Sequence, residues 1–347
     1  NDNSEGGMGK GGSQMMAYPT LFFDYDKDDQ RRDVSVCNYG IVLSAKGNKY
    51  QMNTYNGMGV GKYRINWKKE MGATNSKRNI NFPLLRYADV LLMYAEALNE
   101  VNNGPTQEAI NAVKEVRKRA FRGNEAKAAA GIPTNHDDFL TFIQKERKLE
   151  LSNAGLRRTD LTRWGKQYEM LMAAKQRLID LAKRDGEFAN VPVYRAYYLS
   201  TTPKFEDPTI ALSYIDLSQA EVENLGLKAD QISGLKVLNS SSAGKGSVTA
   251  DLYEKDGKLY SEANKPEGAV KQTYTILNMF SIVSIKQKGN LCVEDVTGVS
   301  SNNTWITGNS GVFYGLQKNM TELMPFNTSK ILDVNAGLEG QQHPAYK

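Results

Sequence analysis

Two carboxylates, Glu146 and Glu150, have the residue type and the spacing that best suit chemistry in this chain of 347 residues. Four positions apart on a helix, both side chains project from the same face. A pair of carboxylates can act as general acid and general base on either side of a glycosidic bond. A glycoside hydrolase is therefore the first hypothesis that the residues raise.

The surroundings of these carboxylates favour a structural role instead. Both project onto the middle of an apolar stripe on the same predicted helix, formed by Phe139, Phe142, Ile143 and Leu149. An unpaired carboxylate is costly to remove from water, so each needs a cationic partner. Arginines of the following turn are the expected partners, namely Arg157, Arg158 and Arg163. We therefore predict an ion-pair network and no enzyme activity.

Motifs for phosphate binding and for histidine chemistry are incomplete. The glycine-rich stretch 57–63 suggests a phosphate loop, but Asn56 takes the place of its first glycine and Tyr63 that of its serine or threonine. Only two histidines are present, His136 and His343, which makes a histidine-based catalytic or zinc site improbable. We predict no catalytic residues and no cofactor.

The spacing of Asp24, Asp26 and Asp28 begins like a calcium-binding loop. Asp29 then occupies the position of its required glycine, and Ser35 that of its terminal glutamate. This excludes an EF-hand. A looser calcium site at these aspartates stays open as a minor alternative, and the leading prediction is that the chain holds no metal.

The charge composition limits the classes of partner that the chain is expected to bind. The chain has 44 basic and 39 acidic residues spread along its length, for a net charge of +5, which predicts no nucleic-acid partner. Cys37 and Cys292 lack the spacing of a metal site, and either a disulfide bridge between them or free thiols would fit the sequence.

Apolar stretches such as 90–95 and 276–285 are too short or too interrupted to cross a bilayer. The glycine-rich start, 1–14, is unlike a signal peptide, and we expect the chain to begin partway through a longer protein.

Helical periodicity dominates residues 81–185. In the first helix, 81–100, apolar residues recur every three or four positions and form one predicted stripe, Leu84, Tyr87, Leu91, Ala95 and Leu98. A second helix over 106–122 completes a helical hairpin with the first. A third, capped by Thr134 or Asn135, runs to about Asn153, and a further helix spans 161–185.

The chain changes character beyond Gly186. Alternating residues predict strands at 191–199 and 248–253, and Asp256-Gly257 predicts a tight hairpin turn. The predicted fold class is mainly α, with tetratricopeptide-like helical hairpins and a loop-rich, β-containing carboxy-terminal region.

Aromatic residues are about twice as dense between Tyr18 and Trp67 as in the whole chain, where they make up 9%. Gly, Asn, Asp and Lys lie between them in no clear period, which indicates short strands and loops. Rings exposed in such a segment would offer a surface for planar or ring-bearing ligands.

Two segments carry a family resemblance. NFPLLRYADVLLMYAEALNE at 81–100 and ERKLELSNAGLRRTDLTRWG at 146–165 closely resemble the signature segments of the SusD/RagB nutrient-binding lipoproteins. The second departs from the family's usual pattern at Asn153, Ala154 and Leu156. Residues 323–346 resemble the family's closing stretch. The resemblance implies the carboxy-terminal portion of a SusD-like protein, whose helical repeats and lipid-bearing cysteine would precede this sequence.

What this family does sets the functional expectation. The resemblance implies non-catalytic binding of an oligosaccharide at the outer face of the outer membrane, and delivery to a SusC-like TonB-dependent transporter. It also implies membrane contact through a lipid anchor upstream of Asn1. A peptide ligand, as in the RagB branch, is one alternative. Another is a helical-repeat scaffold for protein partners, in which the aromatic segment would be buried.

The expected ligand residues follow from the chemistry of sugars, whose rings stack on aromatic faces and whose hydroxyls hydrogen-bond to polar side chains. They are Trp67 and Tyr63 first, then Tyr18, Tyr55 and Asn66, with Trp305 and Tyr314 from a later insertion. We expect Trp164, inside the second signature, to serve packing. We predict that the whole chain forms one family region with four consecutive segments. These are an aromatic-rich part (1–80), a helical signature region (81–185), a β-rich and loop-rich insertion (186–320) and a closing tail (321–347).

Overall fold

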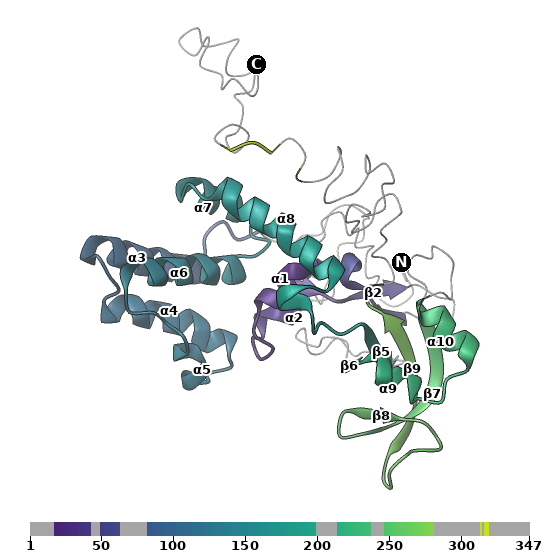
Figure 1. Ribbon diagram of the computed structural model, residues 1–347. Coiled ribbons are helices and arrows are strands. Elements are labelled where there is room, and N and C mark those ends of the chain that lie inside the picture. The colour runs from purple at the N-terminus through teal and green to yellow at the C-terminus, as the bar shows by residue number, and fades with distance from the viewer. Residues whose placement is uncertain are drawn as a thin grey trace, which may run out of the picture. The chain divides into compact units, whose positions relative to one another are not determined.

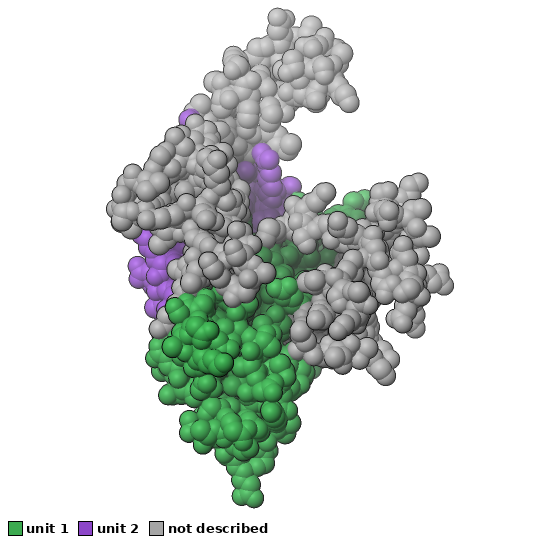
Figure 2. Space-filling view, turned by 90° about the vertical axis from the view of Figure 1, so that its right-hand side faces the viewer, with its two compact units in different colours: residues 1–155, 192–282 green, residues 156–191, 283–347 purple. Residues whose placement is uncertain are grey.

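The computed structural model describes residues 17–42, 49–62, 82–198, 214–236, 246–280, 313 and 316–318. The chain divides into two compact units, one of residues 1–155 and 192–282 and the other of residues 156–191 and 283–347 (Figure 2). The fold is helix-rich with a strand-containing region after it, which confirms the predicted class. The described helices include none that is long and apolar enough to span a membrane.

The predicted hairpin of the first two helices is present in the first unit. Helix α3 (Tyr87–Asn102) ends where Asn103 takes a left-handed conformation, at φ 49°, and α4 (Gln107–Ala120) begins after Thr106, whose side chain accepts a hydrogen bond from the Ala109 amide. The start of α3 was predicted too early. Leu84 precedes the helix and is 84% exposed, so it is not part of a buried stripe.

A third long helix packs against this hairpin. Helix α6 (His136–Glu150) is capped by Asn135, which accepts from the Asp138 amide, and a short α5 (Glu125–Ala129) precedes it in the chain and lies next to α4 (Figure 1). One core joins the three long helices, with Leu92, Ala95, Val113, Val116, Phe139 and Ile143 at its centre. Of these residues, Ala95, Phe139 and Ile143 belong to the predicted apolar stripes. Leu92 was not in the stripe predicted for the first helix, whereas Tyr87, which was, is 72% exposed.

A five-stranded antiparallel sheet forms the other large part of the first unit. Its strands are β5 (Tyr194–Tyr198), β6 (Tyr214–Leu217), β7 (Ser247–Lys255), β8 (Lys258–Tyr260) and β9 (Val270–Asn278), in the order β6-β5-β9-β7-β8. The turn between β7 and β8 places Asp256 and Gly257 at positive φ, 53° and 73°, as a tight hairpin requires. Two short helices, α9 (Gln219–Glu223) and α10 (Ala229–Lys236), add Val222 and Leu235 to the core on one sheet face.

The aromatic-rich segment 17–62 contains the short strands and loops that were predicted, but also two short helices that were not. It contains α1 (Pro19–Asp24), α2 (Arg31–Ser35), the antiparallel pairs β1 (Val36–Cys37) with β4 (Gly59–Val60) and β2 (Tyr39–Val42) with β3 (Lys49–Met52), and the 3-10 turn η1 (Tyr55–Gly57). The Gln30 amide donates to the carbonyl of Ala120 on α4, at 2.9 Å. The Tyr55 amide donates to the carbonyl of Met279, directly after β9, at 3.1 Å. The segment thus contacts both the helices and the sheet.

The second unit corrects one prediction. A single helix was expected over 161–185, but the structure has α7 (Arg157–Arg163), α8 (Gln167–Lys183) and the 3-10 turn η3 (Gly186–Phe188). The break lies at Gly165, whose φ of 65° is a left-handed conformation that glycine adopts without steric cost. The guanidinium of Arg163 lies 4.5 Å from the centre of the Trp164 ring, so this tryptophan has a packing contact at the corner.

Candidate functional site

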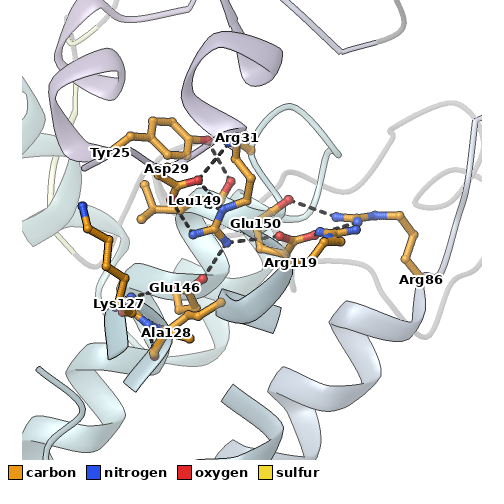
Figure 3. Close-up of polar contacts among 12 residues, drawn as sticks. Tyr25, Asp29, Arg31, Arg86, Arg119, Lys127, Ala128, Glu146, Leu149 and Glu150 are labelled. Atoms are coloured by element: carbon orange, nitrogen blue, oxygen red, sulfur yellow. Dashed lines mark hydrogen bonds and ion pairs between the residues drawn. The ribbon is translucent and has the colours of Figure 1, made fainter. Parts of the chain in front are cut away.

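The carboxylates Glu146 and Glu150 of α6 lie in a buried charged network (Figure 3). Each residue is only 2% exposed. Arg31, at the start of α2, lies between them: its Nη1 donates to Glu146 Oε1 at 2.5 Å and to Glu150 Oε2 at 3.1 Å. Its Nε and Nη2 donate to the carboxylate of Asp29, which holds the guanidinium from the other side. One arginine therefore bridges three carboxylates.

Other cations occupy the remaining carboxylate oxygens. Glu150 Oε1 accepts from Arg86 Nη1 at 2.7 Å and from Arg119 Nη2 at 2.5 Å. Glu146 Oε2 accepts from Arg117 Nη1 at 3.3 Å. The network draws on α2, α4, α6 and the residue directly before α3, so it connects these four helices.

The predicted ion-pair role is therefore present, but the predicted partners were wrong. Arg157, Arg158 and Arg163 were expected to neutralise Glu146 and Glu150, whereas the observed cations come from Arg31, Arg86, Arg117 and Arg119. Arg163 instead pairs with Asp160 on its own helix, at 3.0 Å. No sequence signal singled out Arg86 or Arg117.

The electrostatics of the network keep Glu150 ionised. Burial acts to raise the pKa of Glu150, but the charges of Arg119 and Arg31 outweigh it, and the pKa is lowered. Burial likewise disfavours the charged form of Arg31, yet Glu146 and Asp29 raise its pKa. A general acid needs the opposite, a carboxyl whose pKa is raised so that it carries a proton near neutral pH. This geometry suits a structural clamp and not acid–base catalysis.

Lys62 adds a further cation at the edge of the network. Its Nζ donates to the backbone carbonyl of Glu150 at 2.8 Å, and Arg86 Nη2 donates to the same oxygen at 2.9 Å. Burial, with a smaller contribution from the charge of Arg86, lowers the pKa of Lys62 to about 8. The carboxy-terminal end of α6 is thus surrounded by positive charge.

A small pocket of about 230 Å³ adjoins the network. Its walls mix charge with aromatic rings and consist of Asp24, Asp26, Asp29, Arg117, Phe121, Ala130, Phe142, Lys145, Glu146 and Leu149. The Arg117 guanidinium lies 5.3 Å from the Phe121 ring centre and 5.1 Å from that of Phe142, so it already contacts both rings. The volume is below the roughly 300–1,000 Å³ of typical ligand pockets. The pocket has room for a small group only.

The aspartates considered for a loose calcium site are engaged with lysines. Asp24 pairs with Lys148 at 2.5 Å, and both Asp26 and Asp28 pair with Lys127. Among the described residues, no group of three or more histidine, cysteine, aspartate or glutamate side chains is arranged to hold a metal ion. Cys37 is a free thiol, and Cys292 lies outside the described residues.

The structure describes two of the seven predicted ligand residues. Tyr18, directly before α1, is half-buried, and burial raises the pKa of its hydroxyl. Tyr55 is 0% exposed: its ring packs edge-on against Phe23 and Phe280, and its hydroxyl donates to the carbonyl of Pro192 at 3.0 Å. Its ring has no free face for a ligand, so we place Tyr55 in the core instead. Tyr63, Asn66, Trp67, Trp305 and Tyr314 lie outside the described residues.

Arg195 is a buried charge that the sequence did not flag. On β5 and only 2% exposed, its Nε donates to Asp216 of β6 at 2.5 Å, and its guanidinium lies 4.1 Å from the Tyr214 ring centre. Phe22 and Tyr55 each lie 5.4 Å away by the same measure. The residue therefore holds the aromatic segment against the sheet, and alternation along β5 alone would not distinguish it from an exposed arginine.

Comparison with known proteins finds several that are similar to this chain. SusD-like protein P2 of Formosa agariphila is 30% identical over 151 residues, which are 42% of this chain and 30% of that protein. SusD-like protein P25 of the same organism is 42% identical over 82 residues, 24% of this chain and 15% of that protein. A solved SusD homologue from Bacteroides thetaiotaomicron is 32% identical and covers 46% of this chain and 34% of its own, with a TM-score of 0.42.

The chain spans less than a third of the length of these curated relatives. The model of the SusD family matches residues 9–234, a stretch that contains the charged network, the helical hairpin and the aromatic-rich segment. This match extends over well over half of the chain, and it includes both segments that carry the signature residues. The chain belongs to the SusD family.

Proposed function

We propose that this protein is a non-catalytic nutrient-binding protein that captures an oligosaccharide at the cell surface and passes it to a SusC-like TonB-dependent transporter. The observation that carries the proposal is the family match over residues 9–234. Because a fold hosts many functions, the arrangement of the chain's own residues has to be consistent with it. The charged network and the aromatic-rich segment supply that second support.

The charged network supports binding over catalysis. All four oxygens of Glu146 and Glu150 accept hydrogen bonds from arginines, and both residues are almost fully buried. A hydrolytic pair needs carboxylates that reach a substrate bond from both sides. To reach one, these two carboxylates would have to give up the arginines that neutralise them inside the fold, and breaking a buried ion pair costs roughly 3–5 kcal/mol.

The ligand residues of the proposal are aromatic and polar side chains on the segments beside the helices. The leading candidates are Trp67 and Tyr63. The further candidates are Tyr18, Asn66, Trp305 and Tyr314. Sugars present C–H-rich ring faces that stack on aromatic side chains, and hydroxyls that hydrogen-bond to amides and carboxylates. The density of aromatic residues between Tyr18 and Trp67 supports this choice, and Tyr55 is no longer included because it is buried.

The proposal includes a place of action, for which the family match is the support. It puts the protein at the outer face of the outer membrane, held there by a lipid anchor. It needs no cofactor, no metal and no nucleic acid. A gene for a SusC-like transporter next to the gene for this chain would support the partner, and a neighbourhood without one would count against it.

The decisive experiment measures binding of an oligosaccharide panel by isothermal titration calorimetry, with a pool of short peptides as a parallel arm. We expect at least one oligosaccharide to bind, and Trp67→Ala to weaken that binding at least tenfold. Tyr87→Ala is the matched control, because it removes a ring that is 72% exposed on α3 and is not assigned to the ligand. Equal binding by wild type and Trp67→Ala would refute the site, and binding of peptides alone would refute the ligand class.

A further inference from the structure

Glu150 is surrounded by more cations than its one carboxylate can neutralise. Arg86 Nη1 and Arg119 Nη2 share a single oxygen, Glu150 Oε1, and Arg31 binds the other. Lys62 Nζ and Arg86 Nη2 meet at the backbone carbonyl of the same residue. Figure 3 shows the Arg86 and Arg119 guanidinium groups on the same side of Glu150. Lys62, Arg86 and Arg119 therefore gather around one residue, and we call them the cation cluster.

The charges of the network as a whole do not balance within the described residues. Arg31 and Arg117 bind the carboxylates of Asp29 and Glu146, two cations for two anions. The three members of the cation cluster have only the carboxylate of Glu150, which leaves a surplus of two positive charges. The negative end of the α6 dipole is worth about half a charge and offsets only part of this surplus.

Lys62 is the least compensated of the three cations. Its Nζ donates to the Glu150 carbonyl, and in the part of the chain that the structure describes it pairs with no carboxylate. Its pKa falls to about 8 because burial, together with the charge of Arg86, outweighs the attraction of Glu150. A buried charge without a partner is costly, so an anion beside Lys62 would be stabilised.

The cation cluster can be reached from solvent. The side chain of Arg119 is 61% exposed and that of Arg86 28% exposed. Among the described residues Arg119 donates to Glu150 through Nη2 only, which leaves Nε and Nη1 for a further acceptor. The planar fork of a guanidinium matches the oxygens of a carboxylate or a sulfate, so oxyanions of this kind fit the cluster.

The sequence connects the cation cluster with the proposed ligand residues. Lys62 directly precedes Tyr63, and Asn66 and Trp67 follow four and five positions after it. A ligand that stacks on the rings of this segment could therefore place an anionic group at the cation cluster.

We propose that the cation cluster binds the oxyanion of an acidic sugar, so that the nutrient is an oligosaccharide with carboxylate or sulfate groups. This inference rests on the proposed function, because it assigns a class of ligand to the same binding protein. Uronic acids carry a carboxylate and sulfated sugars carry a sulfate, and both groups accept charge-assisted hydrogen bonds from arginine and lysine. A neutral sugar would leave the surplus charge of the cluster without a partner.

The test compares acidic oligosaccharides with neutral forms of the same backbone, by isothermal titration calorimetry on the full 347-residue chain. The carboxylate arm uses oligogalacturonates and oligomannuronates with their methyl esters, and the sulfate arm uses sulfated galactan oligosaccharides with their desulfated forms. We expect the wild-type chain to bind at least one acidic member tenfold or more tightly than its neutral form. This preference should shrink as the salt concentration is raised, because salt screens exposed charges.

Two variants locate the anion. Arg119→Gln removes the most exposed cation of the cluster and leaves Arg86 on the same oxygen of Glu150, so we expect about tenfold weaker binding of the acidic member and unchanged binding of its neutral form. Arg122→Gln is the matched control, because Arg122 is also exposed and loses the same charge. Lys62→Met supplies a second measurement: raising the pH from 7 to about 9.5 neutralises Lys62, so acidic binding should weaken in wild type and stay constant in this variant.

Three results would overturn the inference: equal affinities for acidic and neutral forms in both arms, equal effects of Arg119→Gln and Arg122→Gln, or no binding of any acidic member. Binding of neutral oligosaccharides that depends on Trp67, without a preference for acidic ones, would refute the acidic ligand and leave the proposed function standing. Failure of every oligosaccharide to bind would refute both.

Discussion

Replacing Glu150 by alanine probes the charged network at its most connected point. The carboxylate accepts hydrogen bonds from Arg31, Arg86 and Arg119, at distances of 2.5 to 3.1 Å. The substitution removes the acceptor and leaves these cations in place. Removing one partner of a buried ion pair costs roughly 3–5 kcal/mol, because the remaining charge is left without compensation.

The geometry places the expected loss near the lower end of that range. The side chain of Arg119 is 61% exposed and that of Arg86 28% exposed, so both regain water when Glu150 is lost. Arg31 is only 10% exposed but keeps Asp29 and Glu146 as partners. We therefore expect Glu150→Ala to lower the free energy of unfolding by about 3 kcal/mol, a large part of the roughly 5–15 kcal/mol typical of folded domains.

Urea denaturation followed by circular dichroism measures this loss. Glu125→Ala is the control, because Glu125 pairs with Lys118 at the surface, where both side chains are about half exposed. Such surface pairs contribute about 0–1 kcal/mol. If Glu150→Ala and Glu125→Ala shift the urea midpoint equally, the network does not stabilise the fold and the structural role assigned to Glu150 is wrong.

Three further perturbations test local features. The pKa of Glu150 is lowered in the folded state, so ionised Glu150 stabilises the fold above the ordinary pKa of 4.5, and this stabilisation is lost as the pH falls below it. Between pH 6 and pH 3 the urea midpoint should therefore fall more steeply for wild type than for Glu150→Gln. The pKa of Lys62 is lowered from 10.5 to about 8, so between these two pH values the unfolded chain keeps a proton that the folded chain releases. The stability of wild type relative to Lys62→Met should therefore rise as the pH increases from 8 to 10.5. A stability difference that does not change with pH would contradict the burial of Lys62. Asn135→Ala removes the cap of α6 and should cost about 1 kcal/mol in the same urea assay, whereas no change would show that the cap is dispensable.

Much of the helical region was predictable because its signals are local. Apolar periodicity located the three long helices, and capping residues such as Asn135 marked where one of them begins. The Asp256-Gly257 turn was recognisable because few residues tolerate positive φ at both positions. The break at Gly165 was missed, since a glycine inside a periodic pattern can either be tolerated in a helix or end it.

Local sequence patterns could not identify the cationic partners of Glu146 and Glu150. The apolar stripe around Glu146 showed that cations were needed, but not which ones. Arg31 and Arg117 are separated from Glu146 by 115 and 29 residues, and only the tertiary fold brings them together. Burial of Tyr55 was equally hidden, because aromatic density does not distinguish an exposed ring from a core ring. The stripe predicted for the first helix failed for a similar reason: Tyr87 and Ala95 were both placed in it, but Tyr87 is 72% exposed whereas Ala95 is buried.

The proposed function requires that the protein bind a nutrient without transforming it chemically. The most direct test incubates the full chain with each oligosaccharide of the panel, measures the bound fraction by titration calorimetry, and then analyses the recovered sugar by mass spectrometry. We expect saturable binding of at least one oligosaccharide that is recovered unchanged, from wild type and from Glu150→Gln alike. Cleavage products from wild type that are absent with Glu150→Gln would contradict it.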